Sequence, residues 1–301
     1  MQNSKTVYII AGPTAVGKTA VSIALAQRLG TDIISADSRQ CYKGMTIGTA
    51  KPDATELAAV KHYFIDSHDV TQNLSAADYE TLALGYIEEV LSSHDAAVVC
   101  GGTGLYINAL CHGLDEMPPT DAEVAKSVED AYAANGLEWL QQAVAQEDPV
   151  FYATGEIQNP ARLMRALSFM RTTGTSITQY RTQSRKQRPF RMVKVALELP
   201  REVLYNRINQ RVDSMMQQGL ENEVRALLPY RQLKNLQTVG YAELFEYFDG
   251  NCTLQEAVEK IKQHSRNYAK RQLTWFRKDP EMRWLRPDDE AIVEKIIGLA
   301  D

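Results

Sequence analysis

The sequence predicts an α/β fold, in which a mostly parallel sheet carries helices on both faces and is joined to a helical insertion domain and a helical C-terminal region. Short apolar, β-branched runs alternate with segments of helical apolar spacing in the first hundred residues. A glycine-rich turn separates the first of these runs from the first helical segment. Both patterns are typical of parallel sheets, whose strands are buried on both faces and connected through helices.

The elements of the sheet follow from these patterns in chain order. Thr6–Ala11 is an apolar, β-branched run and predicts the first strand. Lys18–Leu29 has helical apolar spacing and stops at Gly30, so it predicts the first helix. The other predicted elements are strands at Thr31–Ser35, Ala96–Cys100 and Met192–Leu199 and a helix at Leu82–Leu91.

The segment 116–188 interrupts this alternation. It opens with the prolines 118 and 119, which stop regular structure, and with the helix-capping residues Thr120 and Asp121. Helical spacing follows, with one break at residues 158–160. We therefore predict a core domain of residues 1–115 and 189–301 and a helical insertion domain of residues 116–188. After Pro200 the pattern predicts helices to the end of the chain.

The composition is that of an ordinary globular protein. The 301 residues are 44% apolar and 24% charged, which excludes a chain that is mainly disordered. No apolar run approaches the roughly 20 residues needed to cross a bilayer, and Met1–Thr6 lacks the pattern of a secretory signal. We expect a cytoplasmic protein. Its cysteines form no C-x-x-C pair and are predicted to be reduced and mostly buried; they are Cys41, Cys100, Cys111 and Cys252.

Residues 12–19 fit the phosphate-loop pattern G-x-x-x-x-G-K-[ST] and stand between a strand and a helix, which is the structural context of that motif. Glycines let the backbone curl so that successive N–H groups point at phosphate oxygens, and the helix adds its positive N-terminal end. Lys18 supplies a point charge, and the Thr19 hydroxyl is a hard oxygen ligand suited to Mg²⁺. The motif predicts a P-loop NTPase-like sheet.

The bound phosphate compound is not determined by this loop. The strand Ala96–Cys100 is followed by Gly101 and Gly102, without the carboxylate that many NTPases use to hold Mg²⁺ through water. This weakens a prediction of NTP hydrolysis and leaves either a nucleotide or a diphosphate as the ligand.

Polar residues also follow the second and third predicted strands. Ligands of open α/β sheets bind beyond the carboxyl ends of the strands, so Asp37 is expected to face the phosphate loop. A carboxylate there can accept a proton or hold Mg²⁺; the alternative is a solvated turn residue. Thr103 reaches the same edge. Arg207 and Arg211 are one helical turn apart and can contact phosphate together, although a surface pair with salt bridges has the same spacing.

The charge is unevenly distributed along the chain. The net charge is −5, but residues 157–197 contain nine cations and no acid, and residues 260–278 contain seven cations and no acid. Only 17 of the 33 cations lie elsewhere, together with all 38 acids. Such segregation indicates a face that binds a polyanion; the alternative is a solvated charged surface.

The second of these cationic runs predicts a more specific surface. On a helical wheel its cations Lys262, Arg266, Lys270 and Arg277 lie within about 80°, a stripe able to follow a phosphate backbone. The aromatic residues between them (Tyr268, Trp275 and Phe276) either stack on bases or, for most of them, pack in the core.

Seven sequence blocks in this order resemble bacterial tRNA dimethylallyltransferases, which are also called tRNA isopentenyltransferases. The blocks span nearly the whole chain, and their combination is far more specific than the phosphate loop alone. They are GPTAVGKT at 12–19, ADSRQCYKGMTIGTAKP at 36–52, HYFIDS at 62–67, GGTGLY at 101–106, NPARLMRAL at 159–167, QTVGYAE at 237–243 and YAKRQLTWFRKD at 268–279.

The resemblance implies transfer of a dimethylallyl group from dimethylallyl diphosphate to N6 of the adenosine 3′ of a tRNA anticodon. It implies Mg²⁺ on Thr19, with Asp37 as general base and Thr103 and Lys18 also catalytic. The implied diphosphate ligands are Gly12, Thr14, Ala15, Val16, Gly17, Lys18 and Thr19, with Arg207 and Arg211 added from their spacing. The implied contacts to the anticodon stem-loop are Asp37, Ser38, Arg39, Gln40, Thr103, Lys126, Ala161, Arg162, Leu163, Met164, Arg165, Gln237, Gly240, Tyr241, Lys270, Arg271, Trp275 and Arg277. We expect a monomer with no membrane partner.

Two other function classes share some of these features. A P-loop kinase of a small metabolite or nucleotide would have the phosphate loop and the arginine pair, but it would not need the cationic stripe or so long a cationic insertion. A non-catalytic RNA-binding module with a relict loop would not need Asp37, Lys18 and Thr19 together.

Overall fold

The computed structural model describes residues 5–181 and 185–300 of the 301-residue chain. The described chain divides into two compact units. The core unit comprises residues 1–111 and 187–301, and the insertion unit comprises residues 112–186. Residues 1–4, 182–184 and 301, which fall within the ranges predicted for the two domains, lie outside the described residues.

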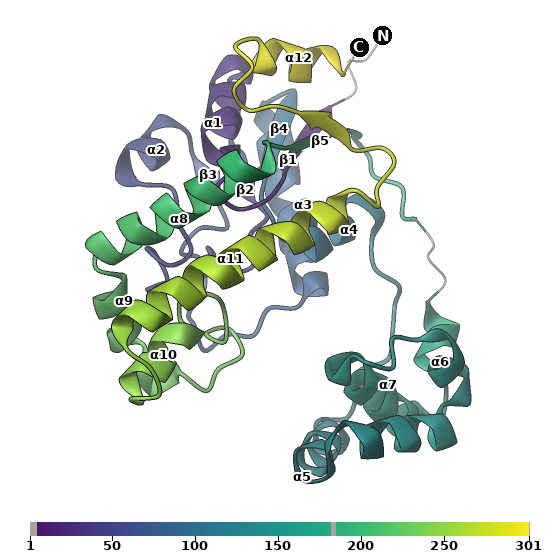
Figure 1. Cartoon of the computed structure of the whole chain (residues 1–301). Coiled ribbons are helices and arrows are strands. Elements are labelled where there is room, and N and C mark those ends of the chain that lie inside the picture. Colours follow the sequence, from purple (N-terminus) through teal and green to yellow (C-terminus); the bar gives the residue numbers. More distant parts are fainter. Residues whose placement is uncertain (1–4, 182–184, 301) are drawn as a thin grey trace. The chain divides into compact units, whose positions relative to one another are not determined.

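A parallel sheet lies at the centre of the core unit (Figure 1), as the sequence predicts. It has six strands, two more than were predicted. Its strand order is β3-β2-β4-β1-β5-β6, so the N-terminal strand lies in the middle. The strands are β1 (Thr6–Ala11), β2 (Ile33–Ser35), β3 (His62–Tyr63), β4 (Ala96–Cys100), β5 (Arg191–Leu197) and β6 (Arg283–Leu285).

Alternate residues of β1 enter two different hydrophobic cores, because successive side chains of a strand point to opposite faces. Val7 and Ile9 pack in a core with residues of α3 and α4, whereas Tyr8 and Ile10 pack in a core with residues of α1, α8 and α12. The helices of the core unit are α1 (Lys18–Leu29), α2 (Ala54–Ala59), α3 (Ala76–Ser93), α4 (Gly104–His112), α8 (Arg201–Gln217), α9 (Leu220–Ala226), α10 (Ala242–Phe248), α11 (Leu254–Phe276) and α12 (Ile292–Gly298), with the 3₁₀ helix η2 (Leu228–Tyr230). Both faces of the sheet are therefore covered, as predicted.

The prediction of helices from Pro200 to the end of the chain is wrong at one place. Arg283–Leu285 forms β6, which extends the sheet by pairing in parallel with Val195–Leu197. A three-residue edge strand shows no detectable periodicity, and for the same reason the two-residue β3 was not predicted. The helix predicted at Leu82–Leu91 is longer, because Ser75 and Asp78 form a capping box that starts α3 at Ala76.

The insertion unit is helical and has a hydrophobic core of its own. It contains α5 (Ala122–Glu147), α6 (Pro149–Thr154), α7 (Pro160–Thr173) and the 3₁₀ helix η1 (Ile177–Tyr180). Gly136, with φ 76° and ψ −170°, divides α5 at a kink. The predicted break at 158–160 is the start of α7, where the side chain of Asn159 caps the helix and Pro160 opens it. The Lys186 N–H donates to His112 O, so the two ends of this unit are adjacent.

No helix within residues 5–181 and 185–300 combines the length and the apolar character that a membrane span requires.

Candidate active site

The phosphate loop joins β1 to α1 and owes its shape to two glycines with positive φ. Gly12 has φ +142°, and a Cβ there would lie 2.8 Å from the carbonyl oxygen of Leu197. Gly17, directly before α1, has φ +108°. Only glycine adopts both conformations without strain, which explains the two glycines of the motif.

Lys18 folds back over this loop, where its Nζ donates to the carbonyl oxygens of Gly12 (3.1 Å) and Pro13 (2.8 Å). Burial lowers the pKa of Lys18 to about 8. The ammonium group is therefore already held at the phosphate site, in an environment that favours an anionic partner.

Arg207 and Arg211 both reach the phosphate loop from α8. Arg207 donates to the carbonyl oxygen of Val16 (3.3 Å), and Arg211 donates to the hydroxyl of Thr14 (3.2 Å). Burial lowers the pKa of Arg211. The structure thus places the pair at the loop rather than in a salt-bridged surface pair.

Asp37 lies at the same cavity as the phosphate loop. The cavity has a volume of about 670 Å³, and its lining residues include Lys18, Thr19, Asp37 and Arg39. The Asp37 Oδ1 accepts the backbone N–H groups of Arg39 (2.9 Å) and Gln40 (3.3 Å). The turn after β2 therefore has a fixed shape, and a solvated, remote Asp37 is excluded.

Thr103 supports this turn through hydrogen bonds to Ser38. Its Oγ1 accepts the N–H of Ser38 (3.0 Å) and donates to the Ser38 hydroxyl (3.3 Å). Thr103 is not among the residues that line the cavity. In this structure its hydroxyl orients Ser38, the neighbour of Asp37.

Gln40, a predicted RNA contact, uses its side chain within the protein. The amide oxygen accepts from the Ser35 hydroxyl (3.3 Å), and the amide nitrogen donates to the carbonyl oxygens of Thr49 (3.2 Å) and Ala50 (3.1 Å). The Gln40 amide thus shapes the segment 46–53, which lines the cavity.

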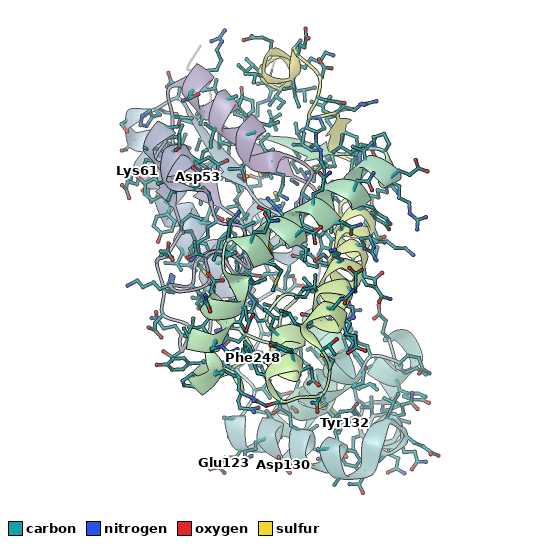
Figure 2. The ribbon with its side chains drawn as sticks, turned by 60° about the vertical axis from the view of Figure 1, so that its left-hand side comes forward. Asp53, Lys61, Glu123, Asp130, Tyr132 and Phe248 are labelled. Atoms are coloured by element: carbon teal, nitrogen blue, oxygen red, sulfur yellow. The ribbon has the colours of Figure 1, made fainter. Side chains whose placement is uncertain are left out.

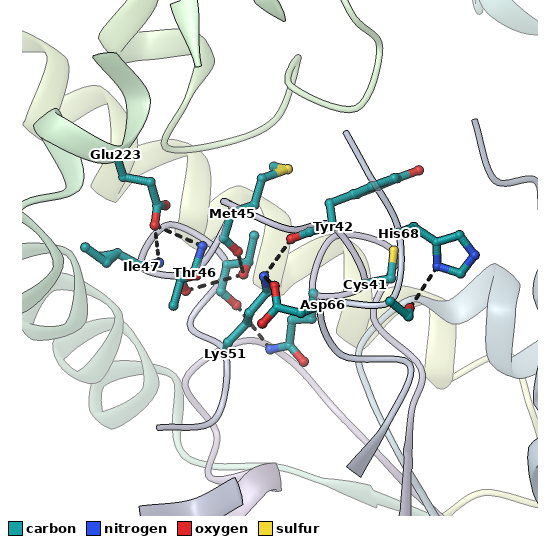
Figure 3. A network of polar contacts seen from close by, with 12 residues as sticks. Cys41, Tyr42, Met45, Thr46, Ile47, Lys51, Asp66, His68 and Glu223 are labelled. Atoms are coloured by element: carbon teal, nitrogen blue, oxygen red, sulfur yellow. Dashed lines mark hydrogen bonds and ion pairs between the residues drawn. The ribbon is translucent and has the colours of Figure 1, made fainter. Parts of the chain in front are cut away.

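Glu223 of α9 also holds this segment, as Figure 3 shows for Thr46 and Ile47. Its carboxylate accepts the backbone N–H groups of Thr46 (2.9 Å), Ile47 (2.7 Å) and Gly48 (2.9 Å). In the same network Lys51 pairs with Asp66 and donates to the Tyr42 carbonyl oxygen. One wall of the cavity is therefore held in place by Glu223, which lies far from it in the sequence.

Tyr241, another predicted RNA contact, is fully buried. Its hydroxyl donates to Glu223 Oε1 (2.7 Å), and a Cβ on Gly48 would lie 2.6 Å from its ring. The Tyr241 side chain packs under the cavity wall and is not available to RNA in this structure. Nearby Gly240 lines the cavity and donates its N–H to Glu243 (2.8 Å), and the exposed Gln237 donates to the Arg231 carbonyl oxygen (2.6 Å).

The cationic stripe predicted along α11 is only partly present. Lys262 pairs with Asp213 (2.8 Å) and Glu259 (3.0 Å), and Arg266 donates to Asn209 Oδ1 (2.6 Å). The prediction that these two cations follow a phosphate backbone is wrong, because both face side chains of α8. A helical wheel shows the spacing of cations but not the polar groups that a neighbouring helix presents.

The exposed cations of this stripe lie on and just after the last turns of α11. Lys270 and Arg271 are exposed, and Trp275 is 40% exposed. Arg277, directly after the helix, is exposed and lies 3.7 Å from Glu198. Of the other aromatic residues, Phe276 is buried and Tyr268 lines the cavity.

The first acid-free run also contains cations that serve the fold. Arg188 is buried in an ion pair with Glu80 (2.7 Å). Lys194, on β5, is buried between Asp279 (2.8 Å) and Glu281 (2.6 Å). Their acidic partners lie far along the chain, so a local count of charge could not detect these pairs.

The predicted RNA contacts of the insertion unit differ in exposure. On α7, Ala161, Arg162 and Arg165 are exposed, whereas Leu163 lies in the hydrophobic core of the unit and Met164 is half-buried. Arg162 pairs with Glu156 (2.8 Å). Leu163 therefore holds α7 in place, and its side chain is not available to RNA.

Lys126 of α5, another predicted RNA contact, is exposed and pairs with Asp130 one helical turn away (3.4 Å). Asp130 and Glu123 both lie on the exposed side of α5, as Figure 2 shows. Lys126 therefore stands among acids on this helix.

Glu223, which holds the cavity wall, was missed in the sequence, and Gln272, which lines the cavity, was covered only as part of the family block at 268–279. Nothing in the local pattern around Glu223 distinguishes it from a surface acid on a short helix. Gln272 did have a detectable signal, since it is a polar residue on the otherwise apolar buried face of α11.

Comparison with known proteins agrees with this geometry. A family model described as IPP transferase matches residues 40–279. The chain is 44% identical over 294 residues to tRNA dimethylallyltransferase 1 of Bacteroides thetaiotaomicron, with 98% of this chain and 96% of that protein covered. It is also 44% identical to a tRNA dimethylallyltransferase of Christiangramia forsetii, covering 94% of this chain and 93% of that protein.

Two solved structures share the fold. The crystal structure of the full-length tRNA isopentenylpyrophosphate transferase of Bacillus halodurans matches with a TM-score of 0.73 and 37% identity, over 98% of this chain and 97% of that one. A eukaryotic dimethylallyltransferase acting on tRNA matches with a TM-score of 0.77 over 96% of this chain and 76% of that one. At 23% identity the second likeness concerns the fold alone.

Proposed function

The chain belongs to the IPP transferase family and is a prenyl-transferring enzyme, and we propose that it transfers a dimethylallyl group from dimethylallyl diphosphate to N6 of the adenosine 3′ of the anticodon in tRNA. The second product is diphosphate. The names of its relatives agree with prenyl transfer to tRNA rather than with phosphoryl transfer to a small metabolite.

One observation supports this reaction above all others: the phosphate loop and Asp37 line the same cavity. Prenyl transfer to an amine needs a site that binds a diphosphate leaving group and a base that takes the amine proton. Lys18 and Asp37 supply these two groups within one cavity, which lies beyond the carboxyl ends of parallel strands.

The leaving group is stabilised by fixed positive charge. As the bond between the prenyl C1 and the diphosphate oxygen breaks, the electron pair stays on the diphosphate, and negative charge grows on its oxygens. We propose that Lys18, the N–H groups of the loop and Arg211 stabilise this charge. Arg207 donates to the loop but does not line the cavity, and we propose that it assists from there.

Mg²⁺ fits this site by the chemistry of its donors. Thr19 and Asp37 are hard oxygen donors at the cavity, and Mg²⁺ typically combines one or two protein oxygens with phosphate oxygens and water. We propose that Thr19 contacts the ion. When bound, Mg²⁺ neutralises part of the diphosphate charge.

Asp37 takes the proton from the attacking amine. As the N6 nitrogen forms its bond to the prenyl C1, its proton becomes acidic and moves to the carboxylate. Both backbone hydrogen bonds of Asp37 go to Oδ1, so we propose that Oδ2 accepts the proton. Because N6 must enter the cavity, the target base is expected to leave its stack.

The prenyl tail needs an apolar wall. The cavity lining contains aliphatic side chains from four parts of the core unit, which are Ile47, Ile208, Val212, Met215, Val239 and Ile261. We propose that the tail packs against these residues. The exposed cations of α7 and of the last turns of α11 are the proposed tRNA contacts, and we expect a cytoplasmic monomer.

Incubation of the protein with labelled dimethylallyl diphosphate and an unmodified tRNA transcript tests this proposal. Label is expected in the RNA, and a transcript with guanosine in place of the adenosine 3′ of the anticodon is expected to remain unlabelled. Absence of label from the first transcript would defeat the proposal. Consumption of ATP with a small acceptor, independent of tRNA, would favour the kinase alternative.

A further inference from the structure

The buried face of α11 contains one polar residue. Ala257, Ile261, Ala269 and Phe276 on this face are apolar and buried. Gln272 lies among them and is 6% exposed. A buried amide is costly unless its donor and acceptor are both satisfied, so the partners of Gln272 show why it stands there.

The Gln272 amide connects two loops of the candidate site. Its Oε1 accepts the backbone N–H of Thr14 (2.8 Å), and its Nε2 donates to the carbonyl oxygen of Gly102 (2.9 Å). One partner is a donor and the other is an acceptor, so this side chain bridges them with one orientation only. Gln272 thus joins the phosphate loop to the loop that follows β4.

The loop after β4 is shaped to accept α11. A Cβ on Gly102 would overlap the Gln272 amide nitrogen, and a Cβ on Gly104 would overlap the Trp275 ring. Both glycines have ordinary φ angles, so close approach of α11 rather than backbone strain explains their lack of a side chain. The helix therefore lies directly on this loop.

Thr14 combines several contacts of the phosphate loop in one residue. Its hydroxyl accepts from Arg211, its backbone N–H donates to Gln272, and the residue lines the cavity. The next residue, Ala15, has a positive φ of 63°, a conformation that non-glycine residues rarely adopt without support. When Thr14 is held in place, the backbone N–H groups of the next loop residues are oriented to contact phosphate.

We propose that Gln272 is a positioning residue that holds the phosphate loop against the loop after β4, and that it thereby sets the affinity of the protein for the diphosphate of the donor. Through Gln272, the shape of the phosphate loop depends on α11, whose exposed residues Lys270 and Arg271 are proposed RNA contacts. The proposal rests on the proposed function only for the identity of the donor.

Binding of inorganic diphosphate with Mg²⁺, measured by calorimetry on the full chain, tests the proposal without prenyl transfer. Gln272→Ala is expected to weaken binding roughly 5- to 50-fold, because two hydrogen bonds that order the loop are lost. Gln263→Ala, an exposed glutamine on the same helix, is the matched control and is expected to bind as the unaltered protein does. Equal affinity in Gln272→Ala would overturn the proposal.

Gln272→Glu separates positioning from a general loss of packing. The ionised carboxylate still accepts from Thr14 but repels the Gly102 carbonyl oxygen, whereas the protonated acid can donate to it. The affinity ratio of the unaltered protein to Gln272→Glu is therefore expected to fall towards one as the pH is lowered through the pKa of the introduced acid. A ratio independent of pH would contradict the assigned hydrogen bonds.

Gly102→Ala tests the geometry from the opposite side. The new methyl group is expected to displace the Gln272 amide and weaken diphosphate binding in the unaltered background. When Gln272 is already alanine, the nearest remaining atom to that Cβ is the Gly12 carbonyl oxygen at 3.3 Å. Adding Gly102→Ala to Gln272→Ala is therefore expected to lower the affinity for diphosphate little further. Additive losses in the double variant would overturn the proposal.

Steady-state kinetics complete the test. Gln272→Ala is expected to raise the KM for dimethylallyl diphosphate while leaving the KM for tRNA unchanged, and a proportional rise of both would indicate a merely structural role. If the unaltered protein binds diphosphate but transfers no prenyl group, the proposed function fails while the role of Gln272 in diphosphate binding stands.

Discussion

At the scale of single residues, Asp37 is held by hydrogen bonds within its own turn. The Arg39 and Gln40 N–H groups fix Oδ1, and Thr103 fixes Ser38 next to it. The carboxylate is thus oriented at the cavity.

Asp37→Ala is expected to lower the single-turnover rate of prenyl transfer roughly 10²- to 10⁴-fold, the range for loss of a general base. Affinity for tRNA is expected to remain. Asp69→Ala is a matched control, since Asp69 is an exposed aspartate that accepts the Thr71 N–H in a similar turn. A rate near that of the unaltered protein would remove Asp37 from the reaction.

The lowered pKa of Lys18 predicts that diphosphate binding depends on pH. Because burial lowers the pKa of Lys18 to about 8, its ammonium charge is complete below that pH and is lost above it. Diphosphate affinity is expected to fall by up to about tenfold per pH unit above that value. Lys18→Arg, whose side chain stays charged, is the control for ionisation of the ligand, and a parallel fall in both proteins would contradict the prediction.

Residues of the candidate site can be predicted from the sequence when they belong to a motif or follow a strand. They are predicted poorly when their role depends on packing against residues that are distant in the sequence. Lys18, Thr19 and Asp37 follow strand ends, and parallel topology brings strand ends together. Tyr241 and Leu163 lie within blocks shared with the family, but a shared block does not distinguish a ligand contact from a buried support. Only the packing of α9 and of the insertion core separates the two.

At the scale of elements, α11 presents different polar groups along its length. Its middle turns meet α8 through Lys262 and Arg266, and its last turns expose Lys270 and Arg271. The cationic stripe could be predicted from the sequence. The helix packed beside it could not, because 36 residues of chain separate the end of α8 from the start of α11.

Lys270→Ala is expected to weaken tRNA binding and to reduce the slope of log K against log salt by about 0.7–0.9, the effect of one lost phosphate contact. Lys262→Ala is the contrasting variant on the same helix, and its slope is expected to stay unchanged because its cation is paired with Asp213 and Glu259. Fluorescence anisotropy over a salt series measures both. Equal slopes for Lys270→Ala and the unaltered protein would mean that Lys270 does not meet phosphate.

Because Glu223 of α9 holds the segment 46–48, its removal is expected to destabilise the protein. Glu223→Ala removes the acceptor of three backbone N–H groups and of the buried Tyr241 hydroxyl. The free energy of unfolding in urea is expected to fall by about 1–3 kcal/mol. Glu221→Ala, on the same short helix, loses only an exposed pair with Arg225 and is expected to change it by less than about 0.5 kcal/mol. Similar losses in both variants would contradict the role of Glu223.

At the scale of the whole molecule, the chain consists of two units with separate cores. The alternation of strands and helices predicted the parallel sheet, and the loss of that alternation predicted the insertion. The short edge strands β3 and β6 were missed because two or three residues form a strand only through the sheet beside them.

Removal of the insertion unit is expected to leave a folded core. The ends of this unit are adjacent at His112 and Lys186, so a short glycine-serine linker can replace residues 113–185. The shortened protein is expected to unfold cooperatively and to bind inorganic diphosphate, whereas its affinity for tRNA is expected to fall about tenfold or more with the loss of the α7 cations. Full tRNA affinity in the shortened protein would assign RNA binding to the core unit alone.

The central place of β1 has a consequence for biosynthesis. The strand β1 is translated before its two neighbours, which lie at residues 96–100 and 191–197 (Figure 1). The nascent chain therefore carries an apolar strand with an open edge until the whole insertion has been translated, and such edges attract chaperones or aggregate. The helices of the insertion make mainly local contacts and are able to fold during this wait.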